Sequence, residues 1–374
     1  MIYLDNAATT KIDPEVYEAM QPYLLEQYGN PSAQYALGTE AKNAVEKARE
    51  TIAGCLNCEP EEIYFTSGGT ESDNWILNQP NWDVIITSEI EHHAVLNNVI
   101  TKHYKSEIGV DKYGRIQLDK FREEIEQFRG MQNICASIMF ANNEIGTIQD
   151  MSIIAEICKD NNVFLHTDAV QAFGHIPIDV QQIPVNALSS SGHKFNGPKG
   201  IGFLYIRKGF DISPILRGGK QENHLRSGTE NVAGIVGIAK AAEISIRDMK
   251  ANTLKINEIR NILYGEITNK IPIAHLNGTA DWRKRLPGSL NFRFDGVRGE
   301  ELVEWFNQNE IAVSSGSACA TGTGEVSHVL RAIGLTEQQA RSSVRFTAGK
   351  FNDRREVQKV VDVLEFYVNT VHRN

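Results

Sequence analysis

The chain has 374 residues, a mass of 41.7 kDa and a formal net charge of −9, with 38 Lys and Arg against 47 Asp and Glu. At roughly 150 residues per domain, this length predicts two or three domains, and the 41% hydrophobic residues supply a sizeable core. The acidic balance argues against direct binding of nucleic acid, whose backbone requires a basic surface. No apolar run approaches the ~20 residues of a membrane-spanning helix, so we expect no membrane partner.

The five cysteines are few for a chain of this length, and their number is odd. Such usage is typical of free thiols in a reducing compartment and not of a disulfide scaffold. The first residues, MIYLDNAATT, lack a basic segment followed by an apolar one, so they do not form a secretory signal. We therefore expect a cytoplasmic protein.

In chain order, the first expected elements are two helices, over residues 13–28 and 39–57. Asp13 followed by Pro14 is typical of a helix start, because Asp is a good N-cap and Pro fits the first turn. Runs rich in β-forming residues then alternate with helix-like stretches, at residues 62–66, 84–88, 134–140, 163–166, 187–190 and 202–206. Several are apolar nearly throughout, as in strands buried on both faces. The alternation predicts crossover connections and a mostly parallel sheet.

After about residue 250 the pattern changes to a long charged amphipathic stretch, residues 250–270, followed by short strand-like runs. These runs, at residues 290–294, 311–314 and 343–347, predict a second and smaller sheet. The sequence thus predicts an α/β protein with two parts. A large α/β domain would span residues 15–250, and a smaller α+β domain would combine residues 1–14 with 251–374.

Two charged residues follow strand-like runs in the first part. Lys194 comes after the run 187–190, among small and polar residues, where partial desolvation makes an amine a better nucleophile. Asp168 comes after the run 163–166, at the edge where open α/β sheets collect ligand-binding residues. Taken singly, Lys194 also fits a solvated surface lysine, and Asp168 also fits a helix N-cap. Together they meet the needs of pyridoxal phosphate (PLP), which requires a lysine for its aldehyde and a carboxylate for its ring nitrogen.

A turn rich in small residues, residues 66–72 (TSGGTES), joins the run 62–66 to a helix-like segment. Small residues let backbone N–H groups converge on an anion at a helix N-terminus, and Thr70 adds a hydroxyl. The turn lacks both the P-loop and the dinucleotide-binding patterns of glycine. It therefore fits a phosphate site of another kind, or a plain strand-to-helix turn.

Cys319 lies in a stretch of Gly, Ser and Thr, so we expect it on a loop, where a thiolate could act as a nucleophile. An incidental exposed thiol is the alternative. Cys55 and Cys58 have the C-x-x-C spacing without a second pair nearby, so no metal site is expected. Cys135 and Cys158 lie in apolar patterns and are predicted to be core residues.

Ten short motifs, in this order, resemble those of the cysteine desulfurases, in the class V aminotransferase group of fold-type-I PLP enzymes. The resemblance covers nearly the whole sequence. The sequence SSGSAC, which ends at Cys319, resembles that of the group of desulfurases with a long loop at this cysteine. The motifs are residues 3–10 (YLDNAATT), 29–32 (GNPS), 66–74 (TSGGTESDN), 91–92 (EH), 142–146 (NNEIG), 166–171 (HTDAVQ), 191–194 (SGHK), 226–229 (RSGT), 314–319 (SSGSAC) and 345–346 (RF).

The resemblance implies a role for each matching residue. Lys194 would hold PLP as a Schiff base, Asp168 would pair with the ring nitrogen, and His92 would stack on the ring, although position alone favours a surface pair with His93. Arg345, with Asn143, would bind the substrate carboxylate. Further cofactor contacts would come from Gln171 and Asn143 at the phenolic oxygen, from Gly69, Thr70, Ser191 and His193 at the phosphate, and from Thr229 at the phosphate of the neighbouring subunit of a homodimer with shared sites.

The implied activity is the conversion of L-cysteine to L-alanine, with the sulfur passing to Cys319 as a persulfide and then to an acceptor protein. Iron–sulfur assembly, tRNA thiolation and DNA phosphorothioation all draw on such donors. An aminotransferase or a selenocysteine lyase of the same fold remains the alternative. A sulfur-relay protein without catalysis would need neither Lys194 nor Asp168.

Overall fold

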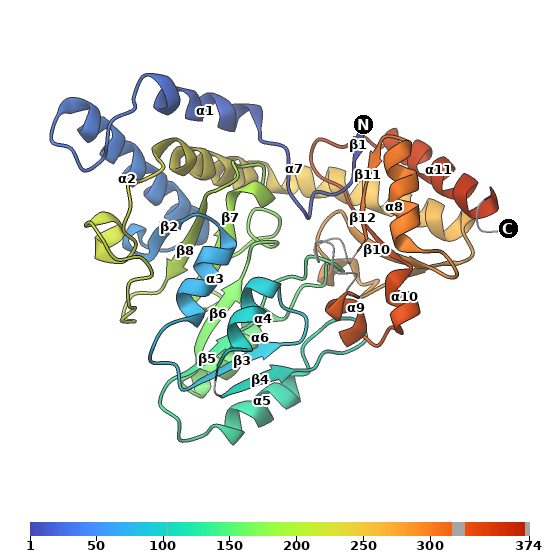
Figure 1. The fold of residues 1–374 in the computed structure, drawn as a ribbon, viewed down its shortest axis with the longest axis horizontal. Coiled ribbons are helices and arrows are strands. Elements are labelled where there is room, and N and C mark those ends of the chain that lie inside the picture. The colour runs from blue at the N-terminus through green and yellow to red at the C-terminus, as the bar shows by residue number, and fades with distance from the viewer. Residues whose placement is uncertain (103, 316–325, 371–374) are drawn as a thin grey trace.

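A computed structural model describes residues 1–102, 104–315 and 326–370 (Figure 1). Its centre is a seven-stranded sheet with the order β2-β8-β7-β6-β5-β3-β4. The strands are β2 (Ile63–Thr66), β3 (Val84–Ser88), β4 (Lys105–Ile108), β5 (Ile134–Ser137), β6 (Phe164–Asp168), β7 (Ala187–Ser191) and β8 (Gly202–Ile206).

This sheet is parallel from β4 through β3, β5 and β6 to β7, whereas β8 runs antiparallel to both β7 and β2. Asp168 at the end of β6 is paired in register with Ser189 of β7. Because the carboxyl ends of parallel strands meet at one edge, the segments that follow β6 and β7 lie side by side. The predicted mostly parallel sheet is confirmed.

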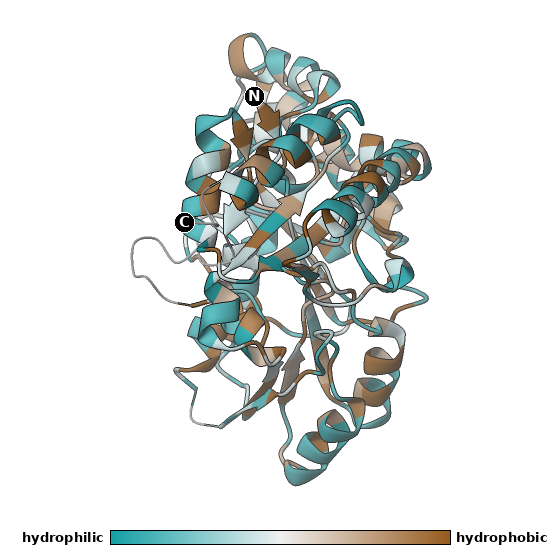
Figure 2. Cartoon of the chain, turned by 90° about the vertical axis from the view of Figure 1, so that its right-hand side faces the viewer, coloured by the Kyte–Doolittle hydropathy of each residue, from teal (hydrophilic) through white to brown (hydrophobic). Residues whose placement is uncertain are grey.

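Helices cover the large sheet, and their apolar and polar faces alternate in colour in Figure 2. The first helix starts as expected, because the Asp13 carboxylate accepts the N–H of Glu15 and Pro14 occupies the first turn. The helices before the long one described next are α1 (Pro14–Leu25), α2 (Ala36–Leu56), α3 (Gly69–Leu77), α4 (His93–Val99), α5 (Leu118–Gln127) and α6 (Met151–Asp160).

The longest helix, α7 (Val232–Lys270), runs from α1 and α2 towards the C-terminal part of the chain (Figure 1). Its first half is buried on nearly every side, and its second half buries one apolar face. The predicted domain boundary at residue 250 falls inside α7, so no break between elements marks it. The two-domain division stays a prediction.

Two smaller sheets lie beyond α7. An antiparallel sheet has the order β12-β13-β10-β9, and β1 (Ile2–Tyr3) pairs in parallel with β11 (Ile311–Ala312). A separate apolar core joins these sheets to α7 and the last helices, with buried residues that include Leu4, Phe292, Phe346 and Leu364. The remaining elements are β9 (Ala274–Leu276), β10 (Ser289–Phe294), β12 (Ser314–Ser315), β13 (Ser343–Thr347), α8 (Gly299–Gln308), α9 (His328–Ala332), α10 (Glu337–Arg341) and α11 (Glu356–Thr370).

The sequence prediction missed β1, β4 and β9 and placed the end of α1 too late. The strand predicted at residues 311–314 is two strands, β11 and β12, in different sheets. Helix α1 stops at Leu25, before residue 28, and the chain then passes close to the backbone of α2 at Gly29, where a Cβ would lie 2.1 Å from the Leu37 carbonyl oxygen. No helix in the described ranges is both long and apolar enough to cross a membrane. Cys135 and Cys158 are buried, as expected.

Candidate active site

A cavity of about 550 Å³ opens at the carboxyl edge of the large sheet. We call it the site cavity. The ends of β6 and β7, the start of α3 and the N-terminal segment at Ala7 to Thr9 line it, and Arg345 reaches it from β13 of the small sheet. Its lining residues are Ala7, Ala8, Thr9, Ser67, Gly68, Gly69, Thr70, Glu71, Asp73, His92, Met139, Asn143, Asp168, Val170, Gln171, Ser191, His193, Lys194, Lys199, Gly200 and Arg345.

Lys194 enters the site cavity from a single 3₁₀ turn, Gly192–Lys194, that directly follows β7. Its Nζ donates to the carbonyl oxygens of Ala7 at 2.7 Å and Ala8 at 2.9 Å. Its own carbonyl accepts a hydrogen bond from His175 Nε2 at 2.9 Å. The half-buried amine is therefore held at the cavity wall by oxygens of the N-terminal segment.

Asp168 ends β6 and is 6% exposed, and its carboxylate accepts the N–H of Val170 at 2.9 Å. Burial raises the pKa of Asp168, against the opposing effect of the nearby His92 and Lys194. Burial and the charge of Asp168 also raise the pKa of Asp73 well above its usual range. Two buried carboxyl groups at this end of the cavity favour a cationic ligand group beside them.

His92 is the N-cap of α4, where its Nδ1 accepts the N–H of Ala94 at 3.1 Å. The ring opens onto the site cavity, and burial of its other side lowers its pKa. A neutral imidazole stacks on a flat ring more readily than an imidazolium, because the charged form is more strongly hydrated. A surface pair with His93 therefore does not fully describe His92, because His92 lines the site cavity and His93 does not.

The other end of the site cavity is built to receive an anion. Gly68 precedes α3 with φ at +154°, and a Cβ on Gly69 would lie 2.5 Å from Val170 Cγ2, so this turn requires small residues. The start of α3 leaves backbone N–H groups without helical partners. Ser191, His193 and Thr70 line the same end. His193 Nδ1 lies 3.1 Å from Thr9 Oγ1, and burial lowers its pKa to about 4.

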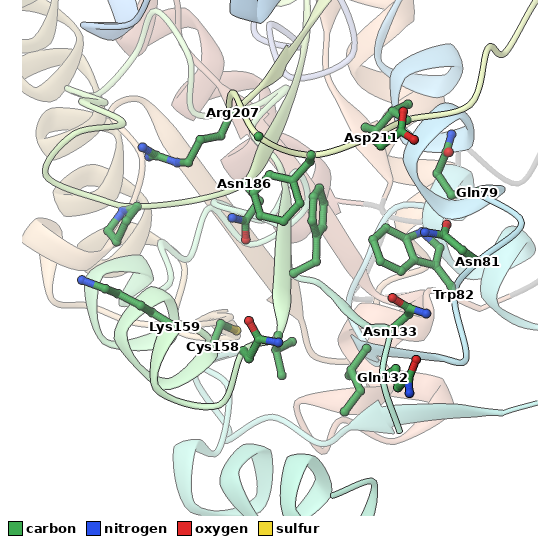
Figure 3. Close-up of a pocket in the computed structure, with 18 of the residues that line it drawn as sticks. Gln79, Asn81, Trp82, Gln132, Asn133, Cys158, Lys159, Asn186, Arg207 and Asp211 are labelled. Carbon is green, nitrogen blue, oxygen red and sulfur yellow. The ribbon is translucent and has the colours of Figure 1, made fainter. Parts of the chain in front are cut away.

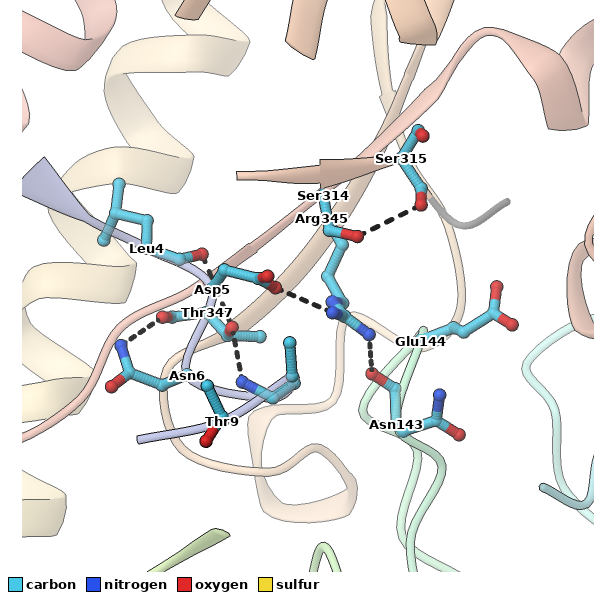
Figure 4. Close-up of polar contacts among 12 residues, drawn as sticks. Leu4, Asp5, Asn6, Thr9, Asn143, Glu144, Ser314, Ser315, Arg345 and Thr347 are labelled. Atoms are coloured by element: carbon cyan, nitrogen blue, oxygen red, sulfur yellow. Dashed lines mark hydrogen bonds and ion pairs between the residues drawn. The ribbon is translucent and has the colours of Figure 1, made fainter. Parts of the chain in front are cut away.

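Arg345 lies in β13 with 3% of its side chain exposed, and its guanidinium reaches the site cavity. Figure 4 shows its two contacts: Nη2 donates to Asp5 Oδ1 at 2.7 Å and Nη1 donates to the Asn143 carbonyl oxygen at 2.9 Å. Its Nε is buried and has no hydrogen-bond partner among the described residues. A donor in that state is available to a ligand carboxylate.

The site cavity thus gathers ten of the twelve residues expected from the sequence. They are Gly69, Thr70, His92, Asn143, Asp168, Gln171, Ser191, His193, Lys194 and Arg345. Thr229 instead lines a neighbouring cavity of about 200 Å³, which shares Ser67 and Gly200 with the site cavity. Cys319 lies outside the described residues.

The sequence reasoning did not single out Asp5, Thr9, Asp73 or Lys199. Asp73 and Lys199 are ionisable groups at the cavity wall, and Asp5 binds Arg345. The motif at residues 3–10 contains both Asp5 and Thr9, but without the fold it carried no stated role. Asp5 and Thr9 can be recognised as site residues only from the fold, because the N-terminal segment pairs with β13 through the bridge between Asp5 and Thr347.

A second cavity of about 560 Å³ lies at the opposite, amino edge of the large sheet (Figure 3). We call it the amino-edge cavity. Two of its polar side chains are bonded within the protein: Asn186 Oδ1 accepts the N–H of Leu165, and Arg207 donates to the carbonyls of Val185 and Val180. It brings together none of the residues expected from the sequence to carry chemistry.

Comparison with known proteins shows the family of this chain. The aminotransferase class-V family model matches residues 2–360. A cysteine desulfurase IscS from Methanosarcina thermophila is 45% identical over 373 residues, which cover 97% of this chain and 91% of that protein. The chain belongs to the class-V aminotransferase family and is a cysteine desulfurase. Among solved structures, a NifS-like protein superposes with a TM-score of 0.90 at 37% identity, covering 98% of this chain and 99% of the other.

Another solved structure similar to the desulfurase is that of SspA in complex with cysteine, with a TM-score of 0.81, 31% identity and coverage of 94% and 100%. Enzymes of this family generally use PLP. The site cavity of the desulfurase fits that cofactor on three observations. A buried carboxyl lies at one end, a lysine amine at the wall, and a cradle that a Cβ at Gly69 would fill lies at the anion end.

Proposed function

We propose that this cysteine desulfurase binds PLP through Lys194 in the site cavity, takes L-cysteine as its substrate and transfers the substrate sulfur to Cys319. The observation that carries the proposal is the convergence of Lys194, Asp168, the start of α3 and Arg345 on one cavity, from segments far apart in the chain. None of these groups alone distinguishes a cofactor site from a structural contact. Their combination matches the amine, carboxylate and anion needs of PLP together.

Asp168 would hold the ring nitrogen, because a buried carboxylate gains most from a cation beside it. Gln171 and Asn143 would contact the phenolic oxygen, and His92 would stack on the ring. The phosphate would lie at the start of α3, with Gly69, Thr70, Ser191 and His193. Bound PLP supplies an electron sink that weakens the bond between the α-carbon and its hydrogen in an attached amino acid.

The substrate would be oriented by its carboxylate at Arg345, with Asn143 beside it. The unpartnered Nε of Arg345 supports this assignment, because a second donor is ready for a bidentate pair. The similar structure of SspA in complex with cysteine supports L-cysteine as the substrate. With the carboxylate fixed there, the α-proton would face Lys194 Nζ, which would take it and return a proton later in the cycle.

The sulfur step needs a thiolate, and we assign it to Cys319. The bond from the substrate β-carbon to sulfur breaks as the bond from that sulfur to Cys319 Sγ forms. L-Cysteine and the thiol become L-alanine and a persulfide, with no external oxidant or reductant. Burial raises the pKa of Cys55 to about 11 and of Cys58 to about 12, so neither forms a thiolate readily.

The proposal includes a homodimer with shared sites, in which Thr229 reaches the cofactor phosphate of the neighbouring subunit. The placement of Thr229 outside the site cavity of its own chain agrees with such a role. A sulfur-acceptor protein would take the persulfide from Cys319. We place the activity in the cytoplasm, where the free thiols Cys55, Cys58, Cys135 and Cys158 would stay reduced.

The test is to incubate the purified holoenzyme with L-cysteine, without reductant, and to measure alanine and the mass of each cysteine-containing peptide. We expect stoichiometric alanine and a mass increase of one sulfur on the peptide that contains Cys319. Cys319→Ser should keep the visible absorbance of the bound cofactor and make no alanine beyond a trace, since a serine hydroxyl cannot store sulfur.

The matched control is Cys58→Ser, which should keep the wild-type rate of alanine formation. Sulfur found on Cys55 or Cys58 instead would refute the assignment of Cys319. Pyruvate or an oxo acid in place of alanine would refute desulfuration in favour of another reaction of the same fold.

A further inference from the structure

Asp5 is the one carboxylate in hydrogen-bonding contact with the Arg345 guanidinium among the described residues. The pair is well shielded, with 19% of the Asp5 side chain and 3% of the Arg345 side chain exposed. Asp5 uses one oxygen on Nη2, the Asn143 carbonyl occupies Nη1, and Nε has no hydrogen-bond partner in the described part of the chain. The guanidinium is thus fixed in its plane at the wall of the site cavity, with Nη1 and Nη2 both hydrogen-bonded (Figure 4).

The position of Asp5 is set by its backbone and does not depend on its side chain. Its carbonyl accepts hydrogen bonds from the Tyr3 hydroxyl and from the N–H of Ala8, both at 3.0 Å. A bridge to Thr347 ties it to β13, two residues from Arg345. The carboxylate is therefore held beside Arg345 by a segment that also supplies carbonyls to Lys194.

Asp5 cancels the charge of Arg345 before any substrate arrives. An internal ion pair at low exposure interacts strongly, and its net charge is near zero. Among the described residues, a second acid close to Arg345 is Glu144, whose carboxyl accepts the Ser327 hydroxyl at 2.6 Å. Burial raises the pKa of Glu144 to about 7, so it adds only a partial charge at neutral pH.

We propose that Asp5 is a specificity-determining residue, which sets the Arg345 site to accept substrates with a single carboxylate and to reject those with a second anionic group. This inference rests on the proposed function, because it takes Arg345 as the group that binds the substrate carboxylate. One carboxylate can share Nη2 with Asp5 and accept from Nε, which has no partner among the described residues. Each additional negative charge close to the Arg345 guanidinium is repelled by the Asp5 carboxylate, which is in contact with that guanidinium.

The test compares propionate and succinate as ligands of the holoenzyme, with dissociation constants from calorimetry, in the wild type and Asp5→Asn. Asparagine keeps an oxygen for Nη2, so the guanidinium stays oriented while the negative charge is lost. We expect propionate to bind roughly tenfold more tightly and succinate at least roughly thirtyfold more tightly in the variant. The KM for L-cysteine should fall, and aspartate should become a stronger competitive inhibitor.

The matched control is Asp13→Asn. Asp13 also lies in the N-terminal segment and pairs with a cation beyond β13, Lys350, but it does not line the site cavity. Its variant should leave the ratio of the succinate and propionate constants unchanged. If Asp5→Asn is not recovered folded, Asp5→Ser poses the same question, because it also removes the charge.

An unchanged ratio in a folded Asp5 variant, or weaker binding of both acids, would overturn the proposal and leave Asp5 with only an orienting role. Calorimetry needs no turnover. A wild type that makes no alanine from cysteine would therefore refute the proposed function, while a changed binding ratio would still support the role of Asp5.

Discussion

The site cavity and the amino-edge cavity lie at opposite edges of the same sheet and have nearly equal volumes, about 550 and about 560 Å³. They differ in the state of their polar groups. In the site cavity, Arg345 Nε and Asp73 Oδ1 are buried without hydrogen-bond partners among the described residues. None of the amino-edge lining residues has such an atom in the described part of the chain.

The difference follows from the direction of the strands. At the carboxyl edge, β6 and β7 end in Asp168 and in the turn that carries Lys194, and the start of α3 faces them. At the amino edge, loop side chains such as Asn186 and Gln79 are used to satisfy backbone groups. The size of a cavity therefore does not identify a binding site. A binding site is indicated where polar or charged groups of the cavity have no partner within the protein and can pair with a ligand.

The largest effect expected from this comparison is that of Lys194→Ala. The variant should lose the visible absorbance of bound PLP and all measurable alanine formation, because no other amine is held at the cavity wall in the same way. Absorption spectroscopy and an alanine assay measure both. Borohydride reduction of the wild type should fix the cofactor on the peptide that contains Lys194, and finding it on another lysine would contradict the assignment.

Much of this site could be predicted from the sequence, because strand-end positions and turn residues are local signals. Lys194, Asp168 and the turn at Gly69 were found in that way, and the family motifs added His92 and Gln171. The pairing of Asp5 with Arg345 could not be predicted, because 340 residues separate them and only the fold brings them together.

The missed strands have an equally physical reason. In β4 (Lys105–Ile108) only the last residue is buried, and in β9 (Ala274–Leu276) all three residues are half-buried. Neither of these two edge strands carries a continuous apolar run, so their pattern is indistinguishable from that of a loop. In contrast, β3 (Val84–Ser88) is buried throughout and was found at its observed bounds.

The second prediction concerns the buried carboxylate of the site cavity. Asp168→Asn should lower the rate of alanine formation by about 10²- to 10³-fold, because a neutral amide cannot stabilise a positive ring nitrogen. Without the cofactor, however, the variant should be at least as resistant to thermal unfolding as the wild type, since the cost of a buried charge is removed. A large loss of stability in the cofactor-free variant would contradict this account.

The third prediction uses Glu91, a buried acid behind the site cavity whose carboxyl accepts the N–H of Met139. Burial raises its pKa to about 8, above the ~4.3 of an unfolded chain. The folded state therefore binds the Glu91 proton more tightly than the unfolded chain does. The stability that this proton confers on the folded state is lost as the pH rises from about 4 to about 8. Glu91→Gln should abolish this loss, which is on the order of 5 kcal/mol over that pH range.

Urea unfolding of the wild type and the Gln variant at pH 5 and pH 8 measures the difference. The control is Glu89→Gln, two residues earlier and exposed, for which the difference from wild type should not change with pH. A pH-independent difference for Glu91→Gln would show that the carboxyl is already ionised in the folded protein.

The smallest effect is expected in the amino-edge cavity. Lys159 is an exposed lysine of that cavity in the last turn of α6, so Lys159→Ala is the counterpart of Lys194→Ala at the opposite edge of the sheet. Removing a cation from a helix C-terminus should cost about 0.3 to 1 kcal/mol of stability. The absorbance of the cofactor and the rate of alanine formation should stay within about twofold of wild type, because surface substitutions away from the chemistry have small effects. A tenfold loss of rate at unchanged folding would show that the amino-edge cavity takes part in the reaction, and would remove the distinction between the two cavities.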